Sequence, residues 1–215
     1  MEIEIIKCQN CPRLVEWREE IAKVKRKAYL DWTYWGKPVP GFGDPKARVL
    51  SVGLAPGAHG SNRTGRIFTG DGSGDFLFPI LHQLGFASQK HAVDLNDGMI
   101  LTDLYITAIC RCVPPANKPT QAEISACIPY LKKEIEIINP GVFVALGKIA
   151  YDGIRVIFPG SFTRKPFTHG AIYSINKNQT VICSYHPSRQ NTQTGRLTNA
   201  MFRAIWKKAS ELVSD

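Results

Sequence analysis

The chain has 215 residues, 44% of them apolar and 10% aromatic, which is enough for one well-packed domain and excludes a disordered protein. Lys and Arg outnumber Asp and Glu by 27 to 18, a formal net charge of +9. This excess favours a polyanionic partner such as nucleic acid, and a basic protein without such a partner is an equal alternative. Because no apolar run suggests a membrane span or a signal peptide, we expect a single cytoplasmic domain over residues 1–215 with no membrane association.

The first half of the chain predicts two helices and two buried strands. A helix is expected over residues 11–32, followed by an irregular loop rich in aromatic residues, Pro and Gly up to residue 45. The apolar run 48–54 has the length and β-branching of a buried strand. Helical spacing over 75–84 and a second apolar run over 100–110 predict a helix and another strand.

The second half continues this alternation. A helix over 119–138 is opened by Thr120 and Glu123, which are spaced as a capping box. A buried strand over 141–147, a helix over 151–157, two strands over 171–175 and 180–185, and a last helix over 197–213 follow. Strands without polar alternation, interleaved with helices, indicate a sheet covered on both faces. The predicted fold is a single three-layer α/β/α sandwich with a central, mainly parallel four-stranded sheet.

Such sheets bind ligands at the carboxyl ends of their strands, which places loops 55–74, 111–117 and 186–196 around one mouth. The loop 55–74 is rich in glycines, which let a backbone approach a ligand closely and expose its N–H groups. It lacks the patterns of a P-loop and of a dinucleotide site, so a nucleotide cofactor is disfavoured. A purely structural loop is the alternative, although long loops in compact domains usually carry function.

Four of the six cysteines fall into two pairs, far apart in the sequence and with no histidine nearby. Four thiolates of this kind fit an iron–sulfur cluster at least as well as zinc, and ordinary scattered cysteines remain an alternative. Cys110 shares strand parity with Cys112 and is an alternative ligand, whereas Cys183 is expected to be a buried thiol. The candidate ligands are Cys8, Cys11, Cys112 and Cys127.

Two segments resemble signatures of the uracil-DNA glycosylase superfamily. The first runs from Gly53 to Asp71, and the second is His186-Pro187-Ser188-Arg189 at the end of the last strand. The cysteine pattern and the segment 105–119 also resemble the iron–sulfur branches of this superfamily. The chain is most similar to family 5, or type b. The resemblance implies a 4Fe-4S cluster on the four paired cysteines and DNA containing deaminated bases as the partner.

Two departures from better-known branches bear on the substrate. Leu54 and Ala55 stand where other branches carry Asp, Asn or Glu, and Ala108 stands where family 4 has an Asn that reads uracil. Both changes are similar to the family 5 pattern. They remove the usual water-activating group and the usual uracil discriminator, and so imply a wider pocket that also accepts hypoxanthine or xanthine.

The resemblance implies a monofunctional glycosylase of base-excision repair, which flips uracil out of DNA, hydrolyses its N-glycosidic bond and leaves an abasic site. This reaction needs a donor at the departing oxygen and a group that favours water or the sugar cation. We predict His186 as the donor, although a lone histidine is more often structural. We predict Asp71 as the carboxylate, with a helix N-cap as the alternative.

The remaining site residues are predicted to contact the base or the DNA. Phe68 is predicted to stack on the flipped base, with core packing as the alternative. Asn117 is predicted to bond the base or the backbone, with a turn as the alternative. The other predicted base contacts are His59 and the backbone at Ala55 and Gly57. The predicted DNA contacts are Arg63 and Arg66 at phosphates, or as solvated surface, and Arg189 and Gln190 as a wedge, with Leu197 as an alternative wedge.

The cluster is expected to be structural, and hydrolysis is expected to need no divalent metal. We further expect a monomer associated with the nucleoid, with a sliding clamp as a candidate partner. One rival interpretation is a non-catalytic iron–sulfur nucleic-acid-binding protein, which would not need Asp71 and His186 at the same mouth. The other is a zinc-stabilised hydrolase, which would be colourless, whereas an iron–sulfur protein is brown.

Overall fold

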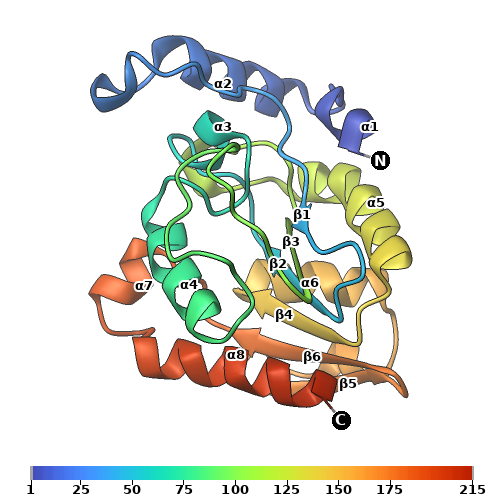
Figure 1. Cartoon of the computed structure of the whole chain (residues 1–215). Coiled ribbons are helices and arrows are strands. Elements are labelled where there is room, and N and C mark those ends of the chain that lie inside the picture. Colours follow the sequence, from blue (N-terminus) through green and yellow to red (C-terminus); the bar gives the residue numbers. More distant parts are fainter. Residues whose placement is uncertain (1, 215) are drawn as a thin grey trace.

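The computed structural model describes residues 2–214, and its centre is one sheet of six strands in the order β1-β3-β2-β4-β6-β5 (Figure 1). The four inner strands are parallel, as predicted, and two antiparallel strands cover the edges. The predicted number of four strands is therefore wrong, because both edges of the parallel core are extended. The strands are β1 (Phe42–Gly43), β2 (Val49–Gly53), β3 (Leu104–Ala108), β4 (Val142–Leu146), β5 (Ile172–Asn176) and β6 (Gln179–Ser184).

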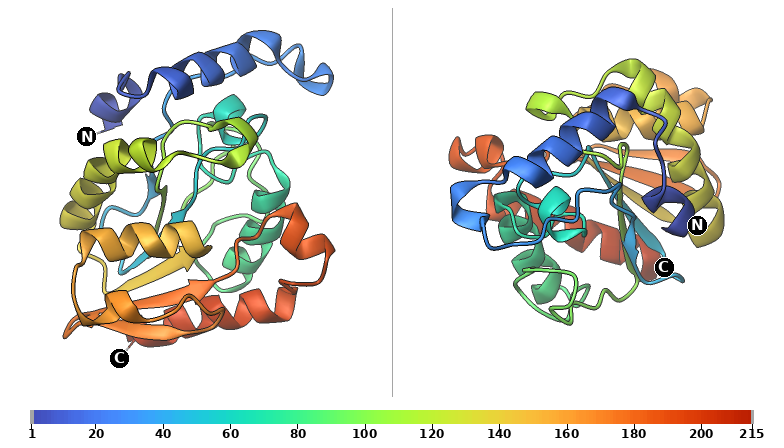
Figure 2. Two further views of the ribbon diagram at one scale, coloured as in Figure 1. Left: turned by 180° about the vertical axis from the view of Figure 1, so that it is seen from behind. Right: turned by 90° about the horizontal axis from the view of Figure 1, so that it is seen from above.

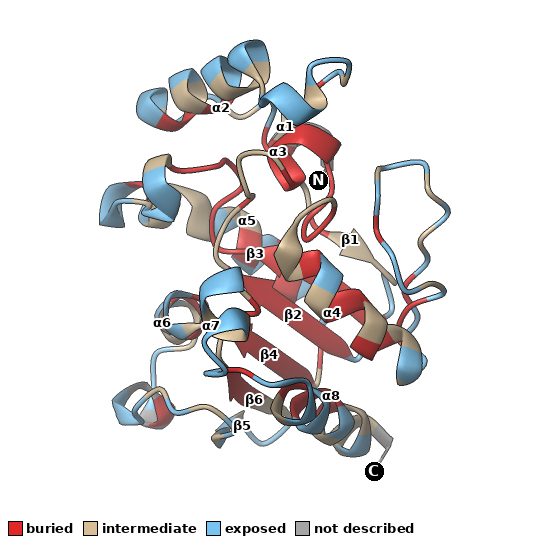
Figure 3. Cartoon of the chain, turned by 90° about the vertical axis from the view of Figure 1, so that its left-hand side faces the viewer, coloured by how far each residue is buried: buried red, intermediate tan, exposed pale blue. Residues whose placement is uncertain are grey.

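Helices cover both faces of this sheet, which confirms the predicted three-layer architecture (Figure 3). Helices α4 (Gly72–Gln83) and α8 (Asn199–Ser214) pack on one face, where Trp206 and Phe202 are fully buried. Helices α5 (Gln121–Ile138) and α6 (Lys148–Ile157) pack on the other face. Because side chains on both faces are buried, β2, β3 and β4 carry no polar alternation.

The remaining helices lie outside the two layers that cover the sheet. No helix within residues 2–214 is long and apolar enough to cross a membrane. Helices α1 and α2 lie at the end of the molecule remote from α8 (Figure 2). The other helical elements are α1 (Glu2–Ile6), α2 (Pro12–Val24), η1 (Lys27–Tyr29), α3 (Ser61–Thr64), η2 (Pro115–Asn117), η3 (Ser161–Arg164) and α7 (Arg189–Gln193).

The N-terminal helix is shorter than the predicted 11–32. Helix α2 ends at Val24, because Lys25 adopts a φ of 58° that cannot continue a helix. The chain then turns so that the rings of Tyr29 and Trp32, which meet edge to face, both pack against the Arg63 guanidinium, each with its centroid 4.0 Å from Arg63 Cζ. The residue spacing within this segment does not reveal a cation–π contact with a distant arginine, so the predicted helix extended beyond its true end.

Helix α2 is attached to α5 by a bidentate ion pair. Arg13 Nε and Nη2 donate to the two carboxylate oxygens of Glu123, both at 2.7 Å. Arg13 Nη2 also donates to the carbonyl of Lys118 at 3.3 Å. The predicted capping box is confirmed, since Thr120 Oγ1 accepts from the backbone N–H of Glu123 and the Glu123 carboxylate accepts from that of Thr120.

The second predicted strand, 100–110, is also shorter in the structure, where β3 begins at Leu104. Asp103 has a φ of 57°, and its carboxylate accepts from the Arg48 guanidinium at 2.7 Å. Its backbone N–H donates to Asp44 Oδ2 at 3.0 Å. This turn interrupts the extended chain, and Leu101 before it forms an isolated bridge with Ala87 instead.

A buried ion pair joins the end of β3 to α5. Arg111 and Glu134 are 1% and 0% exposed, and the Arg111 guanidinium donates to Glu134 Oε2. Thr107 Oγ1 donates to the same oxygen at 2.6 Å. Each of these two ions is stabilised by the other, because an isolated ion is strongly disfavoured in an apolar interior.

Candidate active site

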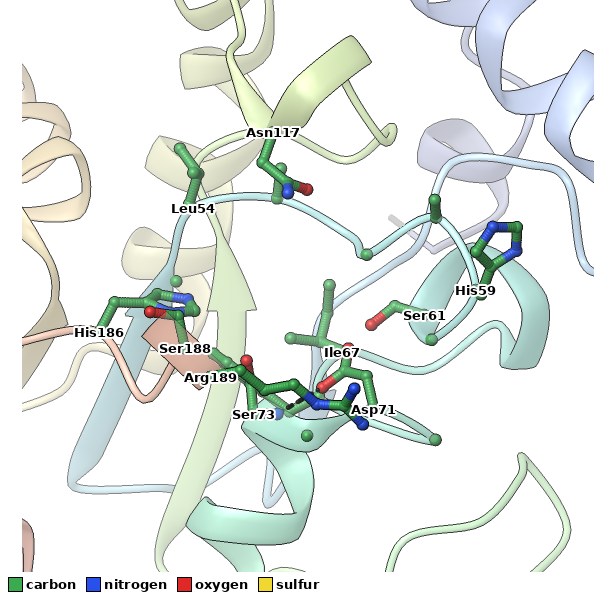
Figure 4. A pocket seen from close by; sticks show the side chains of 18 of the residues that line it. Leu54, His59, Ser61, Ile67, Asp71, Ser73, Asn117, His186, Ser188 and Arg189 are labelled. Atoms are coloured by element: carbon green, nitrogen blue, oxygen red, sulfur yellow. Dashed lines mark hydrogen bonds between the residues drawn. The ribbon is translucent and has the colours of Figure 1, made fainter. Parts of the chain in front are cut away.

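One pocket of about 700 Å³ opens at the carboxyl ends of β2, β3 and β6. Its wall is built from the loop after β2, the end of β3, the segment around η2 and the segment after β6 (Figure 4). The pairing of Gly53 with Ala108 brings the ends of β2 and β3 level, so the loops that follow them meet. The pocket is lined by nine of the predicted site residues, namely Ala55, Gly57, His59, Phe68, Asp71, Asn117, His186, Arg189 and Gln190.

Asp71 is both the N-cap of α4 and part of the pocket wall. Its Oδ1 accepts from the backbone N–H groups of Ser73 at 2.9 Å and Gly74 at 3.1 Å. Its Oδ2 lies against two glycines, since a Cβ would be only 2.3 Å away at Gly60 and 3.1 Å away at Gly57. Burial raises the pKa of the Asp71 carboxyl above its ordinary value. A carboxylate in this position is both fixed and more basic than usual.

His186 follows β6 and presents its ring to the same pocket. The backbone carbonyl of His186 accepts from Asn191 Nδ2 at 2.8 Å, which fixes the segment that carries the ring. Burial lowers the pKa of the imidazole to about 4. At neutral pH the ring is therefore uncharged, with one N–H able to donate and one nitrogen able to accept.

Phe68 is held in a strained backbone conformation beside His186. Its φ is 55°, which is uncommon for a residue with a bulky side chain. Its ring lies against Gly53, where a Cβ would be 3.0 Å from Phe68 Cζ, and its centroid is 5.8 Å from that of His186. Its carbonyl would lie 1.8 Å from a Cβ at Gly74, so the loop closes only with glycine there. Phe68 is 6% exposed, so it packs in the core and also lines the pocket.

His59 and Asn117 lie on the part of the pocket wall near α3 and η2 (Figure 4). His59 Nδ1 is hydrogen-bonded to Tyr34 Oη at 3.0 Å. Burial lowers the pKa of His59, and the neighbouring cations Arg26 and Arg63 lower it further. Asn117 has a φ of 55° and donates its backbone N–H to Pro114, so it is a turn residue whose side chain also reaches the pocket.

The prediction of phosphate contacts for Arg63 and Arg66 does not fit the structure. Both are buried and neither lines the pocket. Arg66 forms an ion pair with Asp97 at 2.6 Å. Arg63 donates to the carbonyls of His59 at 2.7 Å and Gly70 at 3.0 Å. These guanidinium groups hold the loop together because their donors are used inside the protein.

Of the predicted wedge residues, Arg189 and Gln190 line the pocket and Leu197 does not. Arg189 and Gln190 are exposed on α7 at the pocket rim, and the Arg189 side chain lies across Gly72, where a Cβ would be 2.4 Å from Nε. Leu197, the alternative wedge, is fully buried in the core, so that alternative is wrong.

Several lining residues escaped the sequence analysis. Arg26 and Tyr29 reach the pocket from the N-terminal segment, where a continuous helix was expected. Ser61 follows the glycines of the first loop, and Ser188, the N-cap of α7, follows His186. Both serines lie within the two segments that resemble the superfamily signatures, so their sequence positions already indicate a place at the pocket. No pattern in the sequence around Arg26 and Tyr29 indicates that they reach the pocket.

The four candidate ligand cysteines all line a second, smaller pocket, which lies between α2, α5 and the segment after β3. Cys112 Sγ accepts from Arg18 Nη1 at 3.0 Å, and Cys127 Sγ accepts from the backbone N–H of Arg111 at 3.3 Å. Cys110 does not line this pocket, and Cys183 is buried in β6, as expected. Within residues 2–214, no three His, Cys, Asp or Glu side chains are grouped closely enough to hold a single metal ion.

The fold and the pocket are those of an α/β enzyme, in which ionisable side chains gather at the carboxyl ends of the parallel strands. The family model of the uracil DNA glycosylase superfamily matches residues 40–210, and the chain belongs to this superfamily.

Its type-5 relatives are similar over almost the whole chain. The chain is 50% identical to a type-5 uracil-DNA glycosylase of Thermus thermophilus, over 95% of this chain and 93% of the relative. It is 48% identical to a type-5 enzyme of Mycobacterium leprae, over 99% and 94%. A type-4 uracil-DNA glycosylase of Archaeoglobus fulgidus is 34% identical over 70% of each chain. The predicted resemblance to the type-5 branch is confirmed.

Proposed function

We propose that this chain is a monofunctional uracil-DNA glycosylase of base-excision repair. The observation that carries the proposal is that Asp71 and His186, predicted from separate signatures, line one pocket together with Phe68. The relatives named type-5 uracil-DNA glycosylases support the same reaction. A non-catalytic nucleic-acid-binding protein would have no need for a half-buried carboxylate and a neutral imidazole around one cavity.

The proposed reaction begins with extrusion of the target nucleotide into the pocket, where Phe68 stacks on the base. The bond between the sugar C1′ and the base nitrogen then breaks, and its electron pair leaves with the base. The neutral His186 ring donates an N–H hydrogen bond to the departing oxygen and stabilises the developing negative charge.

On the other side of that bond, the sugar develops positive charge. The Asp71 carboxylate stabilises this cation and orients a water molecule. The water oxygen bonds to C1′, one of its protons is transferred to the carboxylate or the departing base, and an abasic site remains. Since the Asp71 pKa is raised by burial, the carboxylate is a better proton acceptor than an exposed aspartate.

The experiment that tests this function uses a duplex oligonucleotide with one uracil, assayed in EDTA for alkali-labile sites. We expect strand breaks at the uracil with the wild-type protein, and a loss of about 100-fold or more in rate for Asp71→Asn and His186→Ala. Asp31→Asn and His91→Ala are matched controls, because both residues are exposed outside the pocket. A wild-type protein that leaves the uracil strand intact would refute the proposal.

A wider substrate range is the second part of the proposal. Leu54, Ala55 and Ala108 line the pocket with apolar or small side chains, so no side chain at these positions selects against a purine edge. Hypoxanthine and xanthine are therefore proposed as further substrates. Side-by-side rates on oligonucleotides with uracil, hypoxanthine and xanthine test this range, and activity on uracil alone would contradict it.

We also propose that Cys8, Cys11, Cys112 and Cys127 hold a 4Fe-4S cluster. The four cysteines share one pocket, while no group is tight enough for a single ion within the described part of the chain. Zinc would draw its four sulfurs to about 2.3 Å around one point, whereas a cluster binds its cysteines at separate corners. Donation from Arg18 and the Arg111 backbone to two of the sulfurs suits anionic thiolates.

Bound there, the cluster would tie α2 to α5 and to the segment after β3, a structural role outside the reaction. Brown anaerobically purified protein with iron and sulfide in equal amounts supports this assignment. Colourless protein that carries zinc would contradict it.

A further inference from the structure

One wall of the candidate active site comes from residues that precede the superfamily match. Arg26 and Tyr29 line the pocket, whereas the match begins at residue 40. Tyr29 is half-buried and Arg26 is exposed. An aromatic ring and a cation at the rim of a nucleic-acid pocket are the two side-chain types that bind single-stranded nucleotides, by stacking and by phosphate contact.

The ring of Tyr29 is fixed from behind by Arg63. The Arg63 guanidinium packs against the rings of both Tyr29 and Trp32, 4.0 Å from each centroid, and is almost completely buried. The same guanidinium donates to the carbonyls of His59 and Gly70 at the two ends of the catalytic loop. Tyr29 is therefore held in place before any ligand arrives, so that stacking on it loses little side-chain entropy.

Arg26 is anchored through its backbone while its guanidinium remains unpaired. Its backbone N–H donates to Tyr34 Oη at 3.4 Å, and Tyr34 Oη is in turn hydrogen-bonded to His59. Among residues 2–214, no carboxylate forms an ion pair with Arg26. An exposed, unpaired cation on a fixed backbone is available to an external anion.

We propose that Arg26 and Tyr29 bind the DNA strand next to the extruded nucleotide, Arg26 at a phosphate and Tyr29 against the neighbouring base. Arg63 is a positioning residue that acts through Tyr29. This inference rests on the proposed DNA substrate and adds a contact surface outside residues 40–210, which match the superfamily model.

The first test is the salt dependence of DNA binding. Dissociation constants for a duplex with an abasic-site analogue are measured over a series of salt concentrations by fluorescence anisotropy. Loss of one phosphate contact in Arg26→Gln should flatten the slope of log K against log salt by about 0.9. Lys23→Gln is the matched control, because Lys23 is exposed on α2 and does not line the pocket. Equal slopes for the two variants would overturn the phosphate contact.

The second test is at Tyr29. We expect Tyr29→Ala to raise Kd for the same duplex about 10-fold, while Tyr29→Phe, which keeps the ring, binds like the wild type. Saturating single-turnover rates should fall far less than affinity, whereas general disruption of the pocket would lower both. Melting temperatures show whether each variant folds, and the surface variant Arg26→Gln keeps the inference testable if Tyr29→Ala does not.

Different results would refute the proposed function and the proposed contact surface. Wild-type protein that does not release uracil refutes the proposed function. If the wild type releases uracil but Arg26→Gln and Tyr29→Ala match Lys23→Gln in affinity, only the additional contact surface is refuted.

Discussion

Replacing Asp71 with asparagine separates the two tasks of this side chain. The Oδ1 atom caps α4 through two backbone N–H groups, and an asparagine oxygen accepts the same bonds. The Oδ2 atom, which lies against Gly57 and Gly60, carries the charge that the proposed reaction uses. Asparagine therefore keeps the cap and removes the charge, while Asp71→Ala removes both.

The size of each effect follows from these contacts. Loss of an N-cap lowers the free energy of unfolding by about 1 kcal/mol, which for a chain of this size lowers Tm by about 2–4 °C. Asp71→Ala should thus melt below Asp71→Asn by this amount. Both variants should lose about 100-fold or more in single-turnover rate on uracil DNA, because neither has a carboxylate.

The pH dependence gives an independent check on the charge. Since burial raises the pKa of Asp71 above its ordinary 3.8, the native state holds this proton more tightly than the unfolded state. The wild type therefore loses stability as pH rises above 3.8, and Asp71→Asn does not. The Tm of Asp71→Asn relative to the wild type should increase between pH 4 and pH 7.

Circular dichroism melts and single-turnover uracil release measure these quantities on the same preparations. The reasoning is refuted if Asp71→Asn melts as low as Asp71→Ala at every pH. It is also refuted if Asp71→Asn keeps most of the wild-type rate.

Three further predictions test other parts of the structure. Because the pKa of His186 is lowered to about 4, wild-type kcat/KM should show no acid limb near the ordinary 6.5, and a limb there would contradict the neutral-donor role. A Cβ at Gly60 would lie 2.3 Å from the Asp71 carboxylate, so Gly60→Ala should lower kcat about 100-fold. At Gly160 an added Cβ would meet no heavy atom within 4 Å, so Gly160→Ala should leave kcat unchanged, and equal rates for the two variants would disprove the steric argument. Glu134→Gln leaves Arg111 buried without its counter-charge and should lower the free energy of unfolding by about 3–5 kcal/mol in urea titrations, whereas a loss below 1 kcal/mol would mean that water reaches Arg111.

Patterns within single segments predicted most of the fold. Buried strands read as short apolar runs because helices cover both faces, and the Thr120–Glu123 capping box marks the start of α5. The errors arose where a distant contact decides the local conformation. Helix α2 stops early because Tyr29 and Trp32 turn to meet Arg63, more than thirty positions along the chain.

The pocket was predicted more fully than the roles of Arg63 and Arg66 in the loop beside it. Strand ends in a parallel sheet lie on one edge, so the loops that carry Asp71 and His186 were expected to meet. Charge alone does not reveal whether a guanidinium points to solvent. Arg63 and Arg66 sit among glycines like phosphate-binding residues, yet each finds its partners inside the protein. Their burial became visible only with the structure.

The bidentate contact of Arg13 with Glu123 has a practical consequence for trimming this protein. Through its additional bond to the Lys118 carbonyl, Arg13 braces the short segment that brings Asn117 to the cavity. A truncated version starting at residue 40, where the superfamily match begins, would keep the sheet but lose that brace. Residue 40 is therefore not a domain boundary, because the type-5 relatives align with 95% and 99% of the chain and the first 39 residues supply this brace.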